Sequence, residues 1–223
     1  MRAVLTSATI LPLAGCTGLL STLDPAGPAA ASIATLWWVM FYGATVLFAL
    51  VAVLLAMSYW RSGLIRRLTP LQWILGLGVG MPVVVLTALV TTAFVQGEGL
   101  LPHRDGVRPV TISVLARQWR WEFAYPESPG VGPTIGVLHM PAGVPVDLTL
   151  ESADVIHGFW IPRLGGKLDA IPGHVNVVRL LADQPGRYHG VCAEFCGDGH
   201  TQMRFEVIAH APEDYQAALE ASR

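Results

Sequence analysis

Two long runs without a charged side chain constrain this sequence more than any other feature. The first covers residues 33–59 and the second covers residues 71–95, and both are apolar almost throughout. A helix needs roughly 20 apolar residues to cross about 30 Å of hydrocarbon, whereas core helices of soluble proteins rarely exceed about 20 residues. The sequence therefore predicts a transmembrane hairpin over residues 33–95.

The connector between the two runs predicts how this hairpin is oriented. It contains Arg61, Arg66 and Arg67 and no acidic residue. Loops rich in arginine stay on the cytoplasmic side of a membrane. We therefore expect the turn to lie inside the cell, and the chain that follows the hairpin to lie in the periplasm or outside the cell.

The first residues have the layout of a secretory leader: Arg2, a short apolar run, and small residues before Cys16. Residues 13–16 read Leu-Ala-Gly-Cys, which resembles a bacterial lipobox. We expect a lipoprotein-type signal peptide at residues 1–15 and lipidation of Cys16. A plain signal with a chance cysteine, or an uncleaved segment, are the alternatives. Residues 16–32 are rich in Pro, Gly and Ala and predict a linker.

Charge is distributed unevenly along the chain. Only 13% of all residues are charged, about half the share of a typical soluble domain, so the chain is not an ordinary cytosolic globule. Past residue 97, 10 Lys and Arg stand against 15 Asp and Glu, which gives this part a net charge of −5. An acidic domain argues against a nucleic-acid partner and favours a basic one.

The chain after the hairpin predicts a β-rich domain at residues 98–211. Three runs alternate apolar and polar residues with period two, at residues 119–125, 144–151 and 203–207. Such alternation predicts strands with one buried face, and Pro/Gly turn signals separate the runs as in an all-β sandwich or barrel. By this alternation alone, Trp119 shares the core face with Trp121. Residues 212–223 predict a short terminal helix.

Cysteine, histidine and methionine gather in one phrase with the pattern C-x3-C-x3-H-x2-M. Its members are Cys192, Cys196, His200 and Met203, and a separate His157 lies upstream. This ligand set suits copper better than hard cations. A Cys192–Cys196 disulfide and a Cys2His2 zinc site are the alternatives. Met203 favours copper because a thioether is not a usual zinc ligand, and a ligand loop between two strands is typical of electron-transfer copper sites.

With its neighbours, this phrase resembles subunit II of haem–copper cytochrome c oxidase from about residue 22 to residue 211. The shared features are the hairpin, the motif Gln118-Trp119-Arg120-Trp121, the phrase from Asp154 to Pro162, the phrase from Lys167 to Gly173, and the copper loop. The resemblance implies a two-helix transmembrane hairpin followed by an all-β, cupredoxin-like Greek-key domain. It also implies a multi-pass protein of the bacterial inner membrane with this domain in the periplasm.

The resemblance further implies a binuclear CuA centre with two copper ions. In this resemblance, the thiolates of Cys192 and Cys196 bridge both copper ions, and the imidazoles of His157 and His200 each bind one copper. Met203 is a weak axial ligand through its thioether, and Glu194 contributes its backbone carbonyl. The Glu194 carboxylate is expected to face subunit I and to help hold a magnesium ion shared with it. Trp119 is expected to be a surface aromatic that receives the electron, against the alternation that assigns it to the core.

The implied function is that of the electron-accepting subunit of cytochrome c oxidase. Electrons from cytochrome c pass through the copper centre to haem in subunit I, where oxygen is reduced to water, and subunits I and III are the implied partners. Asp154 is either an acidic contact for a basic cytochrome or a solvated turn residue. Lys167 and Asp169 are expected to serve subunit packing.

One position departs from the family, because many members have a glutamate at the mouth of a proton path where this chain has Pro70, three residues before Trp73. Three rival functions remain: a quinol oxidase subunit II, which lacks the copper ligands, a membrane-tethered copper carrier, and a structural β domain with a disulfide. The other histidines are expected to have surface or structural roles: His103, His139, His174, His189 and His210.

Overall fold

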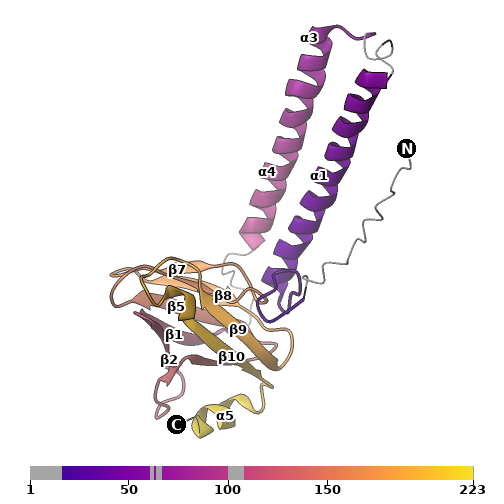
Figure 1. Cartoon of the computed structure of the whole chain (residues 1–223). Helices are drawn as coiled ribbons and strands as arrows, with labels where there is room; N and C mark the ends of the chain where they lie inside the picture. Colours follow the sequence, from indigo (N-terminus) through magenta and orange to yellow (C-terminus); the bar gives the residue numbers. More distant parts are fainter. Residues whose placement is uncertain (1–16, 61–62, 64–66, 100–107, 223) are drawn as a thin grey trace, which may run out of the picture.

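A computed structural model describes residues 17–60, 63, 67–99 and 108–222. The proposed signal peptide, Cys16 with its lipidation, Arg61, Arg66 and His103 lie outside the described residues. Two long helices project together from one end of a β-sandwich, and a short helix, α5 (Tyr215–Ala221), lies at the opposite end (Figure 1). The expected hairpin followed by an all-β domain is confirmed.

The first long helix, α1 (Pro28–Trp60), begins five residues before the expected span. Proline is well suited to the first position of a helix because its φ is preset and its missing N–H is not needed there. The three alanines that follow are strong helix formers, and the Ala31 N–H donates to the Gly27 carbonyl at 2.9 Å. The linker expected at residues 16–32 therefore ends at residue 27.

The second long helix consists of α3 (Pro70–Trp73), a π-helical segment η1 (Ile74–Gly80) and α4 (Met81–Gly99). Thr69 caps its start through a reciprocal pair of hydrogen bonds with Gln72. The wider π turn ends at Gly80, two residues before Pro82, whose ring would crowd the carbonyl four residues earlier in a regular α-helix. The stretches Pro28–Trp60 and Pro70–Val95 are both long and apolar enough to cross a membrane.

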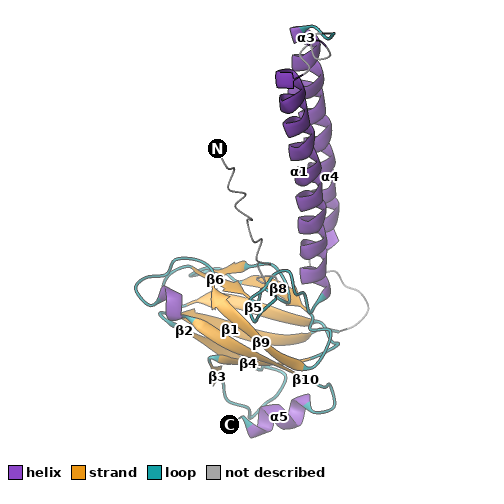
Figure 2. Cartoon of the chain, turned by 45° about the vertical axis from the view of Figure 1, so that its right-hand side comes forward, coloured by secondary structure: helices purple, strands orange, loops and turns teal. Residues whose placement is uncertain are grey.

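Within the described residues, ten strands pair into two five-stranded sheets, which make up the sandwich in Figure 2. The first sheet has the order β3 (Thr134–Ile135), β2 (Arg120–Ala124), β1 (Val110–Arg117), β5 (Val146–Ser152) and β8 (Asn176–Leu180). The second has the order β4 (Val137–Pro141), β10 (Arg204–His210), β9 (Gly186–Cys192), β6 (His157–Trp160) and β7 (Leu168–Ala170). The pairs β1–β5 and β4–β10 are parallel, and the other pairs are antiparallel.

The period-two pattern places most of the core as expected. Alternate residues of β5 and β10 are buried, as in Leu148 and Val207. Trp119 is the exception to the alternation: β1 and β2 pair through Arg117 and Arg120, so Trp119 lies in the two-residue turn between them. Turn residues do not follow the strand alternation, and Trp119 is 44% exposed. The alternation was therefore wrong for this residue.

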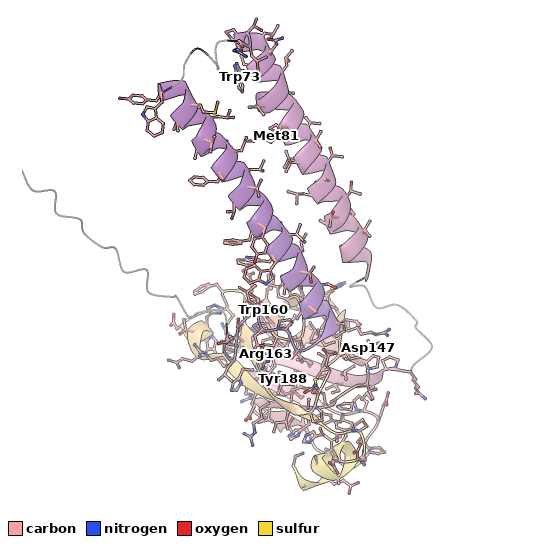
Figure 3. The ribbon with its side chains drawn as sticks, turned by 90° about the vertical axis from the view of Figure 1, so that its right-hand side faces the viewer. Trp73, Met81, Asp147, Trp160, Arg163 and Tyr188 are labelled. Carbon is pink, nitrogen blue, oxygen red and sulfur yellow. The ribbon has the colours of Figure 1, made fainter. Side chains whose placement is uncertain are left out.

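The start of α1 is joined to the sandwich. The Ala26 N–H donates to the Arg163 carbonyl at 2.7 Å, and the Asp183 N–H donates to the Ala26 carbonyl at 2.9 Å. The Arg163 guanidinium contacts the Asp24 carboxylate at 3.0 Å and lies over the Tyr188 ring, beside the base of α1 (Figure 3). The hairpin therefore meets the domain through a hydrogen-bonded segment.

Candidate metal centre

The candidate metal centre lies where β9 ends and β10 begins. Cys192 is the last residue of β9, and His200 opens a short 3-10 turn, η2 (His200–Gln202), just before Met203. His157 begins β6, which pairs with β9 so that Phe159 is opposite Cys192. Sheet pairing thus brings the separate histidine beside the cysteine loop, as the ligand set requires.

Close contacts join all five candidate side chains. Cys192 Sγ lies 3.9 Å from His157 Nδ1 and 3.7 Å from Cys196 Sγ. Cys196 Sγ in turn lies 3.7 Å from His200 Nδ1 and 3.8 Å from Met203 Sδ. The ligand atoms of His157, Cys192 and Cys196 all lie within 4.8 Å of one another, a grouping that could hold a metal ion.

The two cysteines are free thiols. Their sulfur atoms are 3.7 Å apart, well beyond the length of about 2.05 Å of a disulfide. Burial raises the pKa of the Cys196 thiol to about 12, and the neighbouring Cys192 adds to the effect. A metal that binds here must therefore displace thiol protons, as metal ions do at cysteine sites.

A backbone oxygen adds a sixth donor. The Glu194 carbonyl lies 3.2 Å from Cys192 Sγ. The loop can approach this closely because Gly158 has no side chain: a Cβ there would lie 2.8 Å from both the Ala193 carbonyl carbon and the Glu194 nitrogen. The glycine after His157 is the sequence signal for this close packing.

The Glu194 carboxylate lies in a different environment from its carbonyl. It is exposed and contacts the Lys167 ammonium at 3.6 Å, and that ammonium also contacts the Asp169 carboxylate at 3.2 Å. Hydrogen bonding to Asp169 and its charge raise the pKa of Lys167. The three residues form an exposed charged cluster beside the centre.

Aromatic rings form the apolar wall behind the ligands. The Trp121 ring lies 6.0 Å from the His157 ring and 5.3 Å from the Phe159 ring, and Phe205 stacks on Phe159 at 5.0 Å. His157 and Met203 are 0% and 1% exposed. A dry wall of this kind limits the access of water to a metal and influences its potential.

The Trp119 turn covers the outer side of the loop. The Trp119 Nε1–H donates to the Cys196 carbonyl at 3.2 Å, and the Gln118 side-chain amide donates to the same oxygen at 2.8 Å. The indole ring lies on Gly199, where a Cβ would collide with it. The exposed tryptophan is thus one hydrogen bond away from a candidate ligand residue.

Asp154 connects this turn to the buried histidine. One of its carboxylate oxygens accepts from His157 Nε2 at 2.8 Å, and the other accepts from the Gln118 backbone N–H at 2.7 Å. Although burial opposes the effect, the hydrogen bonds from His157, Gln118 and Val155 lower the pKa of Asp154 to about 2. The sequence did not predict this arrangement, because the link to Gln118 spans 36 residues.

Two histidines outside the centre pair with each other. His139 Nδ1 and His210 Nε2 are 2.9 Å apart, on the adjacent parallel strands β4 and β10. Burial lowers the pKa of His139, as does His210, while Glu206 opposes this. Burial also lowers the pKa of His210, against the effect of Asp214. The structural role expected for these histidines fits this contact.

Comparison with known proteins decides the family. Residues 134–210 match the family model for the periplasmic domain of cytochrome c oxidase subunit II. The quinol oxidase subunit 2 of Bacillus cereus is 31% identical over 233 residues, covering 96% of this chain and 77% of the Bacillus protein. The chain belongs to the subunit II family of haem–copper oxidases.

Other members of the subunit II family match this chain over less of its length. Cytochrome c oxidase subunit 2 of Synechocystis is 44% identical over 119 residues, covering 53% of this chain and 35% of that protein, so the match spans about a third of that relative. The crystal structure of the periplasmic domain of subunit II from Bradyrhizobium japonicum is 28% identical with a TM-score of 0.47, covering 54% of this chain and 95% of that one. The family includes proteins named for cytochrome c and for quinol.

Proposed function

We propose that this chain is the electron-accepting subunit of a haem–copper oxidase and that it holds two copper ions. The observation that carries the proposal is the convergence of two free thiols, two imidazoles and a thioether through contacts of 3.9 Å or less. Copper held there would accept and release single electrons with little ligand movement, because the two thiolates would share the charge and a loop between strands is rigid.

The residues of the chain divide the work of such a centre. Cys192 and Cys196 would supply two thiolates once their protons are displaced, and His157 and His200 would supply one imidazole each. Met203 would supply a weak thioether ligand, and with the aromatic wall it excludes water. Trp119 receives the electron at the surface, and its hydrogen bond to the Cys196 carbonyl supports this role.

We further propose that the donor is a cytochrome c and that the electron continues to haem in subunit I, where oxygen is reduced. The complete set of copper ligands favours this donor, because the family resemblance implies that quinol oxidase members lack these ligands. The part of the chain past residue 97 has a net charge of −5, which would attract a basic partner. The rings of Trp119 and Phe195 are exposed and offer apolar surface for such a partner to contact.

The remaining proposals concern placement and assembly. The apolar helices support a multi-pass place in the bacterial inner membrane, with the domain in the periplasm beside subunits I and III. Lipidation of Cys16 after removal of residues 1–15 remains part of the proposal. For Glu194 to hold magnesium with subunit I, its ion pair with Lys167 must open, and Asp169 lies where it can retain that ammonium.

Copper loading of the full chain in detergent tests the metal centre. We expect two copper ions per chain and a purple, mixed-valence optical spectrum. His200→Asn should abolish that spectrum because it removes a ligand, whereas His174→Asn, which changes an exposed histidine hydrogen-bonded to Asn176, should keep it. Zinc as the only bound metal, or a Cys192–Cys196 disulfide found by mass spectrometry, would refute the proposal.

Rapid mixing of the copper-loaded chain with reduced cytochrome c, and separately with a quinol, tests the donor. We expect cytochrome c to bleach the purple band, with a rate that falls as salt is raised because attraction between charged surfaces is screened. Reduction by the quinol alone would reject cytochrome c as donor and leave the copper centre intact. Reduction by neither would favour the membrane-tethered copper carrier.

A further inference from the structure

The carboxylate of Asp154 makes contacts that a surface acid does not need. Oδ1 accepts from His157 Nε2 at 2.8 Å and from the Val155 N–H at 2.7 Å, and the Ser152 hydroxyl lies 3.4 Å away. Oδ2 accepts from the Gln118 backbone N–H at 2.7 Å. Both oxygens are therefore engaged within the chain, and the side chain is 30% exposed.

We propose that Asp154 is a positioning residue that holds the buried ligand His157 and the Trp119 turn in one fixed relation. The inference rests on the proposed function, in which His157 binds copper and Trp119 receives the electron. It assigns Asp154 a role inside the protein, in place of the two readings expected from the sequence, a contact with a basic cytochrome or a solvated turn residue.

The first part of this role is to select the tautomer of His157. A neutral imidazole carries one N–H, and a carboxylate can only accept, so the contact at 2.8 Å places the proton on Nε2. Nδ1 then keeps its lone pair and faces Cys192 Sγ at 3.9 Å. Metal-binding histidines are commonly oriented in this way by a carboxylate on the other ring nitrogen.

The second part is to hold the turn that carries Trp119. Asp154 fixes the Gln118 backbone from one side, and the Cys196 carbonyl accepts the Gln118 and Trp119 side-chain donors from the other. The turn is thus attached at two points. One is Asp154, which contacts the candidate ligand His157, and the other is the carbonyl of the candidate ligand Cys196. Movement of the turn would carry the indole away from the centre.

Asp154→Asn separates the two oxygens chemically. An asparagine has one acceptor oxygen and an NH2 group, so in place of the two carboxylate oxygens it can accept from the His157 Nε2–H or from the Gln118 N–H but not from both. In the full chain loaded with copper, we expect this variant to lose roughly 10- to 100-fold in copper affinity, as is typical when the hydrogen-bond partner of a metal-binding histidine is changed. It should also shift the optical spectrum and lower the maximal rate of reduction at saturating cytochrome c.

Asp198→Asn is the matched control, because Asp198 is an exposed acid in the copper loop. If Asp154 acted only by attracting a basic partner, both variants would raise KM in a salt-dependent way and leave the spectrum and the maximal rate unchanged. That outcome would overturn the inference. Asp154→Glu keeps both oxygens and should recover part of the affinity.

A measurement on the metal-free full chain in detergent tests the inference separately from the proposed function. We expect 15N NMR of the wild-type chain to show the His157 proton on Nε2 and the Gln118 amide to be protected from exchange. A proton on Nδ1, or an unprotected Gln118 amide, would overturn the inference even if Asp154→Asn fails to fold. A chain that shows the expected signals but binds no copper would refute the proposed function alone.

Discussion

At the scale of single residues, the candidate metal centre depends on two glycines as well as on its candidate ligands. Gly158 lets residues 193 and 194 approach β6, and Gly199 supports the Trp119 ring. Neither glycine is in the left-handed region of φ, so each is needed for space and not for backbone conformation. Substituting one of these glycines by alanine fills that space and tests what the close contact contributes to the centre.

Gly199→Ala should separate metal binding from electron uptake. A Cβ at this position would occupy the place of the Trp119 indole, so the ring must move and lose its bond to the Cys196 carbonyl. We expect the copper spectrum to persist while reduction by cytochrome c slows by roughly 10- to 100-fold, as happens when a reacting group is displaced by about 1 Å. Stopped-flow absorbance measures the rate, and tryptophan fluorescence reports the displacement.

Gly132→Ala is the control for this substitution, because a Cβ at Gly132 meets no atom within 4 Å. It should change neither the fluorescence nor the rate. An unchanged rate in Gly199→Ala, together with a clear change in fluorescence, would contradict the role proposed for Trp119.

At the scale of elements, the parallel pair β4–β10 is joined by a contact between two histidines as well as by its ladder. His139 and His210 meet at 2.9 Å with nearly parallel rings, and an N–H···N bond of this kind requires one neutral acceptor nitrogen. The pair faces Glu206 on β10, Asp214 before α5, and the Tyr215 ring on α5. Its protonation state therefore affects the strands and the terminal helix together.

Acid should destabilise this region. Because burial lowers the pKa of both His139 and His210, the unfolded chain binds protons at these positions at a higher pH than the folded chain. The free energy of unfolding therefore falls as pH drops below the ordinary histidine pKa of about 6.5. Chemical denaturation of the full chain in detergent, at several values between about pH 7 and pH 5, measures this slope.

The double variant His139→Gln/His210→Gln should have a smaller slope over the same range, because neither glutamine titrates. His174→Asn, which changes an exposed histidine, should keep the wild-type slope. A double variant with the wild-type slope would show that other groups carry the acid sensitivity.

At the scale of the whole molecule, the hairpin and the domain are held together by the segment before α1. Gly27 is buried there, and a Cβ would collide with the Leu181 carbonyl, a backbone atom that cannot rotate away. Ala30 and Ala34 continue this buried face along the first turns of α1. The position of the domain relative to the hairpin therefore depends on the close packing of this segment and the first turns of α1 against the domain.

Gly27→Ala should loosen this junction without unfolding the sandwich. Crowding of this kind typically costs about 1–3 kcal/mol, so we expect faster hydrogen exchange at Ala26 and Asp183, whose amides bridge the junction. Gly43→Ala is the control, because a Cβ at Gly43 meets nothing within 4 Å. Unchanged exchange at Ala26 and Asp183 in Gly27→Ala would contradict this account.

The sequence by itself determined the features that depend on local pattern. Two charge-free runs long enough to span a membrane, the period-two burial of β5 and β10, and the ligand phrase from Cys192 to Met203 were all readable from residue type and spacing. These properties are set by the transfer of apolar side chains out of water and by the chemistry of the donors, and neither requires knowledge of distant contacts.

Only the tertiary structure decided how distant residues meet. Sheet pairing brings His157 to Cys192, a two-residue turn moves Trp119 out of the core register, and Asp154 reaches Gln118 across 36 residues. The pairing of His139 with His210 depends likewise on the parallel register of β4 and β10. Such contacts follow from strand order and turn geometry, which the pattern of a single strand does not contain.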